Sequence, residues 1–549
     1  MRILTTDEVR QAEREATNRP NVSTLILMQR AGYAVAQFCL SQFKFTSVCA
    51  VCSHNNHGGN GLVAAEALRD LGINVSVIIL AKEISELDPD TATICSQLQP
   101  GPIWVSALDD FESEAVTEAL AADLIIDAIT GGDFILPLPL TAKKAVDAIN
   151  NSAAIVVSVD LPSGIDGNSR VPAHENGADA VFSHGIIAFI APRPAHVFAE
   201  LTSGPIAISD IGVQPVLVPN ETAVNVITGE EVGIAFPPRI NDAHKSGFGH
   251  LLVIAGSLGK AGAAALAGIA ALRSGVGLVT VACPKSIQAA VAAFAPELMT
   301  EGLEETAAGA ISTKASDTIS DLLAGKDVVV LGPGLSREEE TCRFVRRLVA
   351  RCPLPLVLDA DGLNAFDGHY RELQVRSSRY RVLTPNPGEA ARLLGISVEE
   401  VQKDRLKTAQ RICHDTGFCV VLKGFRTVVA GASGETWLNM SGNPALAKSG
   451  SGDVLCGVIG AALANKRLIM SRLSGTEEEQ QEEFAVHASA LMKDISVAAA
   501  VHLHGLAGDV TRDQMHENTV LATDLLKNLS EAFRECEVQI DRGLFYLQR

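Results

Sequence analysis

The chain has 549 residues, which is too long for one hydrophobic core and predicts two or three domains. Its composition, 47% hydrophobic and 20% charged, is ordinary for a globular protein. The formal net charge of −19 argues against a general nucleic-acid or anionic-membrane surface, and the most apolar window, residues 261–272, is too short to span a bilayer. Eleven scattered cysteines and a start without a signal-peptide pattern predict reduced thiols in the cytoplasm.

The first part of the chain alternates helical and strand patterns. Helices are expected from Thr6 through Ala16 and over residues 25–38, followed by a buried strand at residues 47–52. The glycine-rich segment S-H-N-N-H-G-G-N-G (Ser53–Gly61) then reads as a turn into a further helix. More strands, separated by helical segments, are expected at Val75–Leu80, Asp123–Ile129 and Ala154–Asp160. This order predicts an α/β domain with a Rossmann-like, doubly wound sheet.

Four side chains in these strands raise a choice between chemistry and structure. Asp127 precedes A-I-T-G-G, and Asp160 opens D-L-P-S-G-I-D. A carboxylate at the carboxyl end of a parallel strand suits catalysis or ligand binding, although an Asx turn would explain either residue alone. The C-x-x-C of Cys49 and Cys52 lies in an apolar strand without partner cysteines, which favours ordinary strand residues over a redox or zinc site.

A turn-rich stretch at residues 216–230 predicts the linker, and we expect domains of residues 1–222 and 223–549. Strand-and-turn patterns follow the linker at Leu251–Gly256, Val328–Leu335 and Leu356–Asn364. The last of these carries Asp359 and Asp361, which either serve the site or are structural. An acidic run, T-E-E-E-Q-Q-E-E-F, lies within residues 472–493 and is expected to be an exposed insertion.

The most informative stretch is G-N-P-A-L-A-K-S-G-S-G-D-V-L-C-G (Gly442–Gly457), which leads into a buried helix. A glycine-rich turn at a helix N-terminus leaves backbone N–H groups free to bind an anion such as a phosphate. Gly450, Ser451 and Gly452 would form this anion hole, and Asp453 beside them could take a proton from a substrate hydroxyl. A glycine turn with an N-capping aspartate is the structural alternative.

With three further motifs this stretch resembles the ribokinase-like ADP-dependent NAD(P)H-hydrate dehydratases. The motifs are L-T-P-N-P-G-E-A-A-R-L-L-G (383–395), V-L-K-G-F-R-T (421–427) and V-H-L-H-G-L-A-G-D (501–509). The resemblance covers roughly the last 310 residues, the size of a domain, and implies a ribokinase-like α/β sandwich with Asp453 as the catalytic base. It also implies three groups of binding residues: substrate contacts at Ala263, Gly334 and Asn386, nucleotide contacts at Lys423, Gly424, Phe425, Arg426, Thr427 and Gly452, and Mg²⁺ at Glu389.

Two features of this second domain keep an alternative open. The dehydratases more often have His where this chain has Asn386, and the N-x-x-E pattern of Asn386–Glu389 also occurs in ribokinase-like kinases. The K-G-F-R-T segment could likewise be a plain hairpin. The alternative is therefore a small-molecule kinase, for example of a vitamin alcohol, fused to a non-catalytic nucleotide-binding domain.

The N-terminal motifs resemble the NAD(P)H-hydrate epimerase domain. They are, in order, I-L-T-T-D-E-V-R, L-I-L-M-Q-R-A-G, N-H-G-G-N-G, D-A-I-T-G and D-L-P-S-G-I-D, and the resemblance covers about 215 residues. It implies substrate contacts at Asn56, Asn60 and Asp160, and a potassium site at Asp127, Ser163 and the position of His57.

This chain departs from the epimerase pattern at two positions. His57 replaces an asparagine that supplies a potassium ligand, and Asn60 replaces an aspartate of the substrate loop. Since an imidazole nitrogen is a poor partner for a hard cation, we expect a weakened potassium site and a weak or inactive epimerase. A non-catalytic ligand-binding or oligomerisation module is the third interpretation.

The two resemblances together imply a bifunctional nicotinamide-nucleotide repair enzyme. ADP would phosphorylate the hydroxyl of hydrated NADH or NADPH (NADHX, NADPHX), and phosphate would then leave to restore the dihydropyridine and yield AMP. The N-terminal domain would interconvert the R and S hydrates. We expect small-molecule substrates, a Mg²⁺ site and a weakened K⁺ site as above, a homo-oligomer, and no nucleic-acid or membrane partner. The kinase alternative differs in its product, a released phosphorylated substrate.

Overall fold

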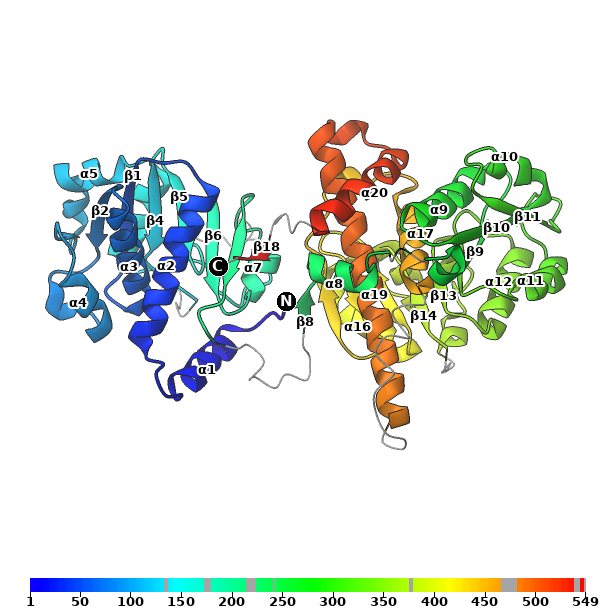
Figure 1. The fold of residues 1–549 in the computed structure, drawn as a ribbon, viewed down its shortest axis with the longest axis horizontal. Coiled ribbons are helices and arrows are strands. Elements are labelled where there is room, and N and C mark those ends of the chain that lie inside the picture. The colour runs from blue at the N-terminus through cyan, green and yellow to red at the C-terminus, as the bar shows by residue number, and fades with distance from the viewer. Residues whose placement is uncertain are drawn as a thin grey trace. The chain divides into compact units, whose positions relative to one another are not determined.

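The computed structural model describes residues 1–132, 137–171, 179–213, 224–239, 241, 243–374, 379–465, 481–537 and 544–547. The chain divides into two compact units, Met1–Glu221 with Asp541–Arg549, and Thr222–Ile540. Both are α/β units whose sheets are mainly parallel, which confirms the fold class predicted from the sequence (Figure 1). Within the described residues, no helix combines the length and the apolar character that crossing a membrane requires.

The first unit is built on one eight-stranded sheet in the order β18-β7-β6-β5-β4-β1-β2-β3, with all neighbouring strands parallel. Its strands are β1 (Ser47–Cys52), β2 (Asn74–Ile79), β3 (Ile103–Trp104), β4 (Leu124–Ala128), β5 (Ile155–Val159), β6 (Gly185–Phe189), β7 (Ile206–Ser209) and β18 (Leu544–Tyr546). Its helices are α1 (Thr6–Thr17), α2 (Thr24–Gln42), α3 (Asn56–Asp70), α4 (Pro89–Cys95), α5 (Glu114–Leu120), α6 (Leu140–Asn150) and α7 (Pro194–Phe198). The strand order reverses between β1 and β4, and ligands of such sheets bind at the carboxyl ends of the strands at this point.

The sheet of the first unit is buried on both faces. Alternate residues of β1 show this: Val48 and Ala50 pack with α2 and α3, whereas Cys49 and Val51 pack with α5 and α6. Cys52 lies on the α3 face, opposite Cys49, and all eleven cysteines are free. The alternation of a strand therefore places the two cysteines of the C-x-x-C on opposite faces of the sheet.

The C-terminal end of the chain belongs to the first unit. Strand β18 pairs in parallel with β7 through Leu544, Phe545 and Tyr546, and Phe545 is buried in the first unit's core. This differs from the expected division at residues 222 and 223, which assigns the whole C-terminus to the second unit. Three residues are too few to give a recognisable strand period, whereas in the structure they cover the exposed edge of β7.

The second unit contains a ten-stranded sheet in the order β11-β10-β9-β12-β13-β14-β15-β16-β17-β8. Its strands are β8 (Val224–Val226), β9 (His250–Ile254), β10 (Leu278–Pro284), β11 (Met299–Leu303), β12 (Val328–Leu331), β13 (Leu356–Leu358), β14 (Arg381–Leu383), β15 (Cys419–Leu422), β16 (Val428–Ala430) and β17 (Thr436–Leu438). The strands from β11 to β15 are parallel, and β16 is antiparallel to both β15 and β17.

The α-helices described in the second unit differ widely in length. They are α8 (Gly229–Ala235), α9 (Ala261–Arg273), α10 (Gln288–Ala292), α11 (Ser316–Leu322), α12 (Glu339–Arg351), α13 (Asp361–Asn364), α14 (Pro387–Leu394), α15 (Val398–Lys403), α16 (Arg405–Thr416), α17 (Ser451–Ala464), α19 (Gln481–Gln514) and α20 (Ala522–Glu537). The side chains of the expected acidic run, residues 476–484, lie outside the described part of the chain, so its exposure stays a prediction; residues 488–493 of the expected insertion belong to α19 and are half-buried.

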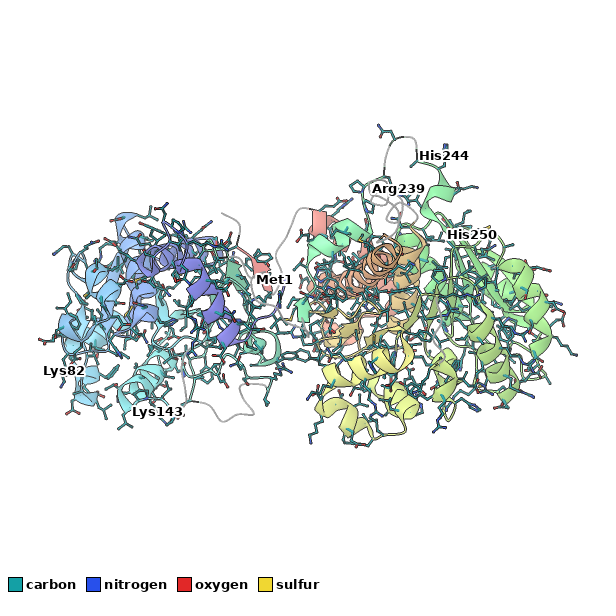
Figure 2. All side chains as sticks on the ribbon, turned by 90° about the horizontal axis from the view of Figure 1, so that it is seen from below. Met1, Lys82, Lys143, Arg239, His244 and His250 are labelled. Carbon is teal, nitrogen blue, oxygen red and sulfur yellow. The ribbon has the colours of Figure 1, made fainter. Side chains whose placement is uncertain are left out.

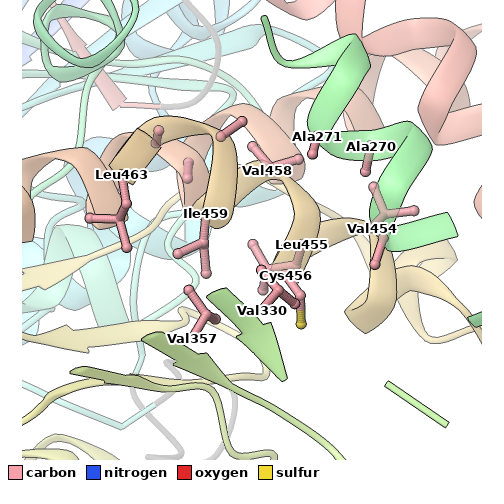
Figure 3. Close-up of a cluster of buried hydrophobic side chains, with 14 of the residues drawn as sticks. Ala270, Ala271, Val330, Val357, Val454, Leu455, Cys456, Val458, Ile459 and Leu463 are labelled. Atoms are coloured by element: carbon pink, nitrogen blue, oxygen red, sulfur yellow. The ribbon is translucent and has the colours of Figure 1, made fainter. Parts of the chain in front are cut away.

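Helix α17, which follows the G-S-G-D motif, is the central buried helix of the second unit. Figure 3 shows its apolar side chains between α9 and strands β12 and β13. Gly457 and Gly460 allow this close packing, because a Cβ on Gly457 would lie 2.2 Å from the carbonyl oxygen of Ala267 and one on Gly460 would lie 2.8 Å from Val330. The packing fixes the position of the helix and therefore of the residues at its N-terminus.

Two side chains marked in Figure 2, Arg239 and His250, connect the entry segment of the second unit to its sheet. The guanidinium of Arg239 lies 4.2 Å from the centre of the Phe248 ring and donates to the carbonyl of Gly275 over 2.8 Å. The Nε2 of His250, at the start of β9, lies 2.8 Å from the hydroxyl of Thr280 on β10. The contacts of Arg239 tie the segment before β9 to the turn before β10, and the contact of His250 joins β9 to β10.

Candidate active sites

A pocket of about 710 Å³ lies in the first unit at the carboxyl ends of β1 and β4. Its wall includes all three predicted substrate contacts, Asn56, Asn60 and Asp160. Residues of α1 and α2 form the opposite wall, with Arg14 and Met28 among them. The pocket therefore occupies the crevice that the strand order predicts, and its volume suits a small-molecule ligand.

The glycine-rich segment that borders this pocket is helical, not a loop. Helix α3 begins at Asn56, and the side chain of Asn55 caps it by accepting hydrogen bonds from the amides of His57 (3.0 Å) and Gly58 (3.4 Å). A Cβ on Gly58 would lie 2.0 Å from the Ser53 carbonyl oxygen, and one on Gly59 would lie 2.5 Å from the sulfur of Met28. The glycines therefore serve the close approach of α3 to β1 and α2, which a sequence pattern cannot distinguish from a turn.

Asp127 and Ser163, two of the predicted potassium ligands, are buried and bonded to each other. The hydroxyl of Ser163 donates to Asp127 Oδ1 (2.5 Å), while the amide of Ser163 (2.9 Å) and the hydroxyl of Ser158 (2.8 Å) donate to Asp127 Oδ2. The Ser163 hydroxyl also accepts from the amide of Thr130 over 2.8 Å. Burial raises the pKa of Asp127, although these hydrogen bonds oppose that effect. Both carboxylate oxygens are thus engaged by protein donors.

The third predicted potassium ligand, His57, packs against the loop that follows strand β4. A Cβ on Gly131 would lie 2.6 Å from His57 Nδ1, so the imidazole covers the backbone there. A potassium ion prefers oxygen ligands, and this set offers an imidazole together with a carboxylate whose oxygens already accept hydrogen bonds. These residues do not fit a potassium ion.

Asp160 enters the pocket beside a cation that sequence reasoning did not identify. Its carboxylate forms an ion pair with Arg193 and accepts a hydrogen bond from the amide of Gly132 (2.9 Å). Although burial alone raises the pKa of Asp160, the charge of the Arg193 guanidinium holds it below its usual value. Arg193 follows β6 in A-P-R-P-A-H, where no local pattern distinguishes it from a surface arginine.

In the second unit, the carboxyl ends of β13 and β15 meet in a buried ion pair. Lys423 Nζ lies 2.6 Å from Asp359 Oδ1 and 3.8 Å from Glu389 Oε2, and the hydroxyl of Thr384 donates to Asp359 Oδ1 over 2.6 Å. Although burial alone lowers the pKa of Lys423, the two carboxylates raise it above its usual value. Asp359, whose role the sequence left open, is thus in contact with a predicted nucleotide-binding residue.

The start of α17 lies directly beside this ion pair. A Cβ on Gly452 would lie 3.5 Å from Lys423 Nζ and 3.9 Å from Asp359 Oδ2. The αL backbone of Gly450 (φ 90°) begins the helix, whose first turn leaves amides without intrahelical partners. Burial and the negative charges of Asp359 and Asp361 raise the pKa of Asp453 to about 7, with Lys423 opposing them. The carboxylate is therefore poised to accept a proton near neutral pH.

The predicted substrate contacts Ala263 and Gly334 adjoin each other near this cluster. A Cβ on Gly334, whose φ is 63°, would lie 3.1 Å from the Cβ of Ala263 and 3.1 Å from that of Lys260. Lys260 in turn pairs with Asp361 over 3.1 Å, and Asp361 also accepts from the amide of Ser336 (2.9 Å). Asp361 thus connects the start of α9 to the glycine turn after β12.

The backbone between the two carboxylates of the D-A-D segment is strained. Ala360 has φ 47°, a left-handed conformation that costs a residue with a Cβ about 1 kcal/mol or more. This conformation allows Asp359 to face Lys423 while Asp361 faces Lys260. Such strain tends to occur at functional sites, which supports the assignment of both residues to this site.

The N-P-G-E segment forms a capping box at the start of α14. The side chain of Asn386 accepts from the amide of Glu389 (2.9 Å), and Glu389 Oε2 accepts from the amide of Asn386 (2.8 Å). Burial raises the pKa of Glu389. The pattern therefore has a complete structural explanation, while the Glu389 carboxylate still reaches the Lys423 cluster.

The K-G-F-R-T segment joins the antiparallel strands β15 and β16. Arg405 holds the turn by donating to the carbonyls of Phe425 and Leu422, and Gly424 (φ 141°) leaves room for that guanidinium. Phe425 is 59% exposed, and the guanidinium of Arg426 lies 4.7 Å from the centre of its ring. The hydroxyl of Thr427 donates to the carbonyl of Gly424 over 3.0 Å. The segment is a hairpin, yet it places Lys423 beside Asp359 and Glu389 and leaves the ring of Phe425 exposed.

Two side chains of α19, for which no role was predicted, support the glycine-rich Gly442–Gly457 segment. The carboxylate of Asp509 accepts from the amide of Gly442 (2.8 Å) and from the side chain of Asn443 (2.9 Å). His504 Nε2 lies 3.0 Å from the carbonyl oxygen of Ser451. Burial lowers the pKa of His504 to about 4, so it is neutral at pH 7 and can donate from Nε2 to that carbonyl. In the sequence, only the joint occurrence of the motif V-H-L-H-G-L-A-G-D and the Gly442–Gly457 segment could have indicated these two contacts.

In the part of the chain that the structure describes, no group of three or more His, Cys, Asp or Glu side chains is arranged to hold a metal ion. In the second unit this follows from the position of Lys423, which takes the place between Asp359 and Glu389. Mg²⁺, however, keeps several waters and usually binds through one or two carboxylates plus substrate phosphates. The hard oxygens of Glu389 fit an ion carried in this way.

Comparison with known proteins identifies both units. The family described as NAD(P)H-hydrate dehydratase matches residues 251–531, and the family described as YjeF-related protein N-terminus matches residues 24–195. The bifunctional NAD(P)H-hydrate repair enzyme Nnr of Moorella thermoacetica is 33% identical over 98% of this chain and 98% of that protein. The enzyme of the same name from Escherichia coli is 32% identical over 95% of this chain and 92% of that protein.

A solved structure of an ADP/ATP-dependent NAD(P)H-hydrate dehydratase from Bacillus subtilis, co-crystallised with ATP/Mg²⁺, is 28% identical, with a TM-score of 0.45. It covers 57% of this chain and 99% of the bacterial one. The full-length likeness to the repair enzymes, and the match of one family to each unit, carry the assignment. The chain belongs to the family of bifunctional NAD(P)H-hydrate repair enzymes.

Proposed function

We propose that the second unit dehydrates S-NADHX and S-NADPHX with ADP, and that the first unit interconverts the R and S hydrates. The observation that carries the dehydratase assignment is Asp453 at the N-terminus of α17, with its pKa raised to about 7, beside the Lys423–Asp359 pair. The family membership supports this activity and not the alternative of a vitamin kinase.

The dehydration requires that a poor leaving group, hydroxide, becomes a good one. Asp453 takes the proton of the substrate hydroxyl while the oxygen of that hydroxyl attacks the β-phosphorus of ADP, and AMP leaves. The amides of Gly450 and Gly452 stabilise the transferring phosphoryl group together with the positive end of α17, whereas the amide of Ser451, also predicted for this anion hole, donates to the carbonyl of Lys448 over 3.3 Å. The electron pair of the ring nitrogen then expels phosphate from the ring carbon, and loss of a proton from the adjacent ring carbon forms the double bond and returns the pair to the nitrogen.

The other predicted residues support binding. Lys423 offers a charge-assisted contact to a phosphate, and the exposed ring of Phe425 offers a surface for the adenine. Ala263 and Gly334 form a side-chain-poor wall that a nicotinamide ring can approach closely. When Mg²⁺ is bound, it neutralises phosphate charge, and Glu389 would hold it.

The product decides between a dehydratase and a kinase. The full-length chain is incubated with purified S-NADHX and either ADP or ATP, and the absorbance of the dihydronicotinamide is followed. We expect NADH, AMP and orthophosphate from ADP. A phosphorylated dinucleotide that accumulates without recovery of the NADH absorbance would instead establish the kinase.

We propose that the first unit, if it epimerises the hydrate, does so without potassium. The support is the arrangement of Asp127, Ser163 and His57, which does not fit that ion. We expect the conversion of R-NADHX to the S form by the full-length chain to be equally fast in potassium and sodium chloride of equal ionic strength. His57→Asn restores an oxygen ligand and should make the rate higher in potassium.

Asn60→Asp is the matched control for this comparison, because it restores the family's residue in the same pocket without adding a potassium ligand. It should leave the ratio of the two rates at one. A wild-type chain that epimerises several times faster in potassium than in sodium would show that His57 is tolerated as a ligand. The full-length chain is the proper material, because β18 from the C-terminus completes the sheet of the first unit.

A further inference from the structure

The ion pair of Asp160 and Arg193 lies at the floor of the first unit's pocket. Asp160 follows β5 and is 5% exposed, while Arg193 precedes α7 and is 6% exposed. Both residues line the pocket, and the guanidinium donates through Nη1 to Asp160 Oδ1. The second carboxylate oxygen accepts from the amide of Gly132, which follows β4. The carboxylate is thus held from two sides and remains part of the pocket wall.

Two unfavourable features coincide at this pair. Asp160 has φ 65°, a left-handed conformation that a residue with a Cβ rarely adopts. The Nε of Arg193 is buried and has no hydrogen-bond partner among the residues that the structure describes. Buried polar groups are normally satisfied, and a buried ion pair is a poor source of stability compared with apolar side chains of similar volume. Stability therefore does not explain why this pair occupies the pocket floor.

A histidine fixes both partners of the pair through their backbones. His196 Nδ1 accepts from the amide of Arg193 over 2.9 Å, so the proton of the neutral ring is on Nε2. That nitrogen lies 2.6 Å from the carbonyl oxygen of Asp160 and donates to it. Burial lowers the pKa of His196 to about 4, and the ring is neutral at pH 7. His196 thus links the end of β5 to the start of α7 through two hydrogen bonds.

The segment after β4 is adapted to the same arginine. A Cβ on Gly132 would lie 2.6 Å from Arg193 Nε, so only glycine allows the guanidinium to cross this segment while the Gly132 amide reaches Asp160. Three separate segments, the ends of β4 and β5 and the start of α7, therefore converge on one carboxylate. Their convergence orients that carboxylate more strictly than a simple surface ion pair would.

We propose that Arg193 is a positioning residue for the epimerisation: it holds the carboxylate of Asp160 in the orientation that the hydrated nicotinamide ring requires. The proposal rests on the epimerase function proposed above for this unit. When Asp160 takes the proton of the hydroxyl, the O–H electron pair forms a carbonyl at the hydroxyl-bearing carbon, and the bond from this carbon to the ring nitrogen breaks with its electron pair passing to the nitrogen. The nitrogen then attacks the other face of the carbonyl, and Asp160 returns the proton to the oxygen, which gives the other epimer. Without Arg193, Asp160 would be a buried carboxylate with no paired cation and with freedom to rotate.

The test uses the full-length chain, whose second unit serves as an internal control. With S-NADHX and ADP, the appearance of NADH reports the dehydratase alone. With R-NADHX and ADP, NADH appears only as fast as the R form is converted. We expect Arg193→Met to leave the rate with S-NADHX unchanged. With R-NADHX, after subtraction of the spontaneous conversion, kcat should fall about 100-fold while KM for the R hydrate changes little.

A double-mutant cycle distinguishes positioning from a general structural role. If Arg193 acts through Asp160, the variant Asp160→Asn with Arg193→Met converts R-NADHX no more slowly than Asp160→Asn alone. Arg193→Lys, which keeps the cation, should recover part of the kcat lost in Arg193→Met while its thermal unfolding midpoint equals that of the wild type.

Several results would overturn the proposal. Undiminished conversion of R-NADHX by Arg193→Met, or additive losses in the cycle, would show that Arg193 does not act through Asp160. A properly folded Arg193→Lys variant with no more activity than Arg193→Met would exclude the charge as the cause. A wild-type chain that converts R-NADHX no faster than buffer would refute the epimerase function itself, and with it this role of Arg193.

Discussion

Asp453→Asn should lower the rate of dehydration of S-NADHX by about 10²–10⁴-fold, because the variant keeps the shape of the side chain and loses only the proton acceptor. The amides at the start of α17 are retained, so the Michaelis constant for the nucleotide should change little. The measurement is the initial rate of NADH formation by the full-length chain at saturating ADP. Turnover close to that of the wild type would exclude Asp453 as the base.

The same carboxylate predicts the pH dependence of the dehydratase. Burial, with Asp359 and Asp361, raises the pKa of Asp453 to about 7, and only the ionised form can accept a proton. The rate should therefore be constant well above pH 7 and should fall about tenfold per pH unit below it. In Asp453→Asn, the residual rate should lack this acid limb.

The stability of Asp453→Asn is the control for both measurements. A carboxyl group with a raised pKa in the folded state stabilises the fold when protonated, and this stabilisation is lost as the pH rises through about 7. The neutral asparagine does not lose it. The thermal midpoint of the variant at pH 8 should therefore equal or exceed that of the wild type, so that lost activity cannot be ascribed to unfolding.

The sequence predicted the elements whose pattern is local. The strands at residues 47–52 and 154–160 have continuous apolar runs, and the structure places strands β1 and β5 there. The helix after G-S-G-D was recognised from its small apolar residues, and α17 is indeed buried along nearly its whole length. Periodicity and turn residues contain enough information for such elements.

Other features depend on contacts between distant residues, and the sequence could not reveal them. The role of Asp359 was undecided because it follows from Lys423, which is 64 residues away. Arg193 and Asp160 meet only because β5 and β6 are adjacent in the sheet. Strand β18 forms only because β7 offers an edge to a tail that is more than 300 residues further along the chain. Topology, not local pattern, creates each of these contacts.

The N-x-x-E segment illustrates a pattern with two explanations. Asn386 and Glu389 were predicted to bind substrate and magnesium, and in the structure they cap α14 reciprocally. The same side chain of Glu389 also lies 3.8 Å from Lys423. A capping box and a site residue need the same spacing and the same residue types, so no sequence argument separates them.

Lys423→Ala should have two separable effects, because this lysine pairs with the buried carboxylate of Asp359 and, as we propose, also contacts a phosphate of the nucleotide. Loss of the charge-assisted phosphate contact should raise the apparent Michaelis constant for ADP. Loss of the cation leaves Asp359 buried and unpaired, which typically costs about 3–5 kcal/mol of unfolding free energy. Lys423 also opposes the raised pKa of Asp453, so the acid limb of the rate should move to higher pH.

The double variant Lys423→Ala with Asp359→Asn separates these effects. It removes the charge of Asp359 together with that of Lys423 and leaves only the more distant Glu389 without this cation, so part of the lost stability should return while the Michaelis constant for ADP stays high. Lys407→Ala, which removes an equal charge from the surface of α16, is the control and should change neither quantity. The measurements are urea unfolding and ADP titrations of the initial rate. If the ADP titrations of Lys423→Ala and wild type coincide, Lys423 belongs to the fold alone and the nucleotide binds elsewhere.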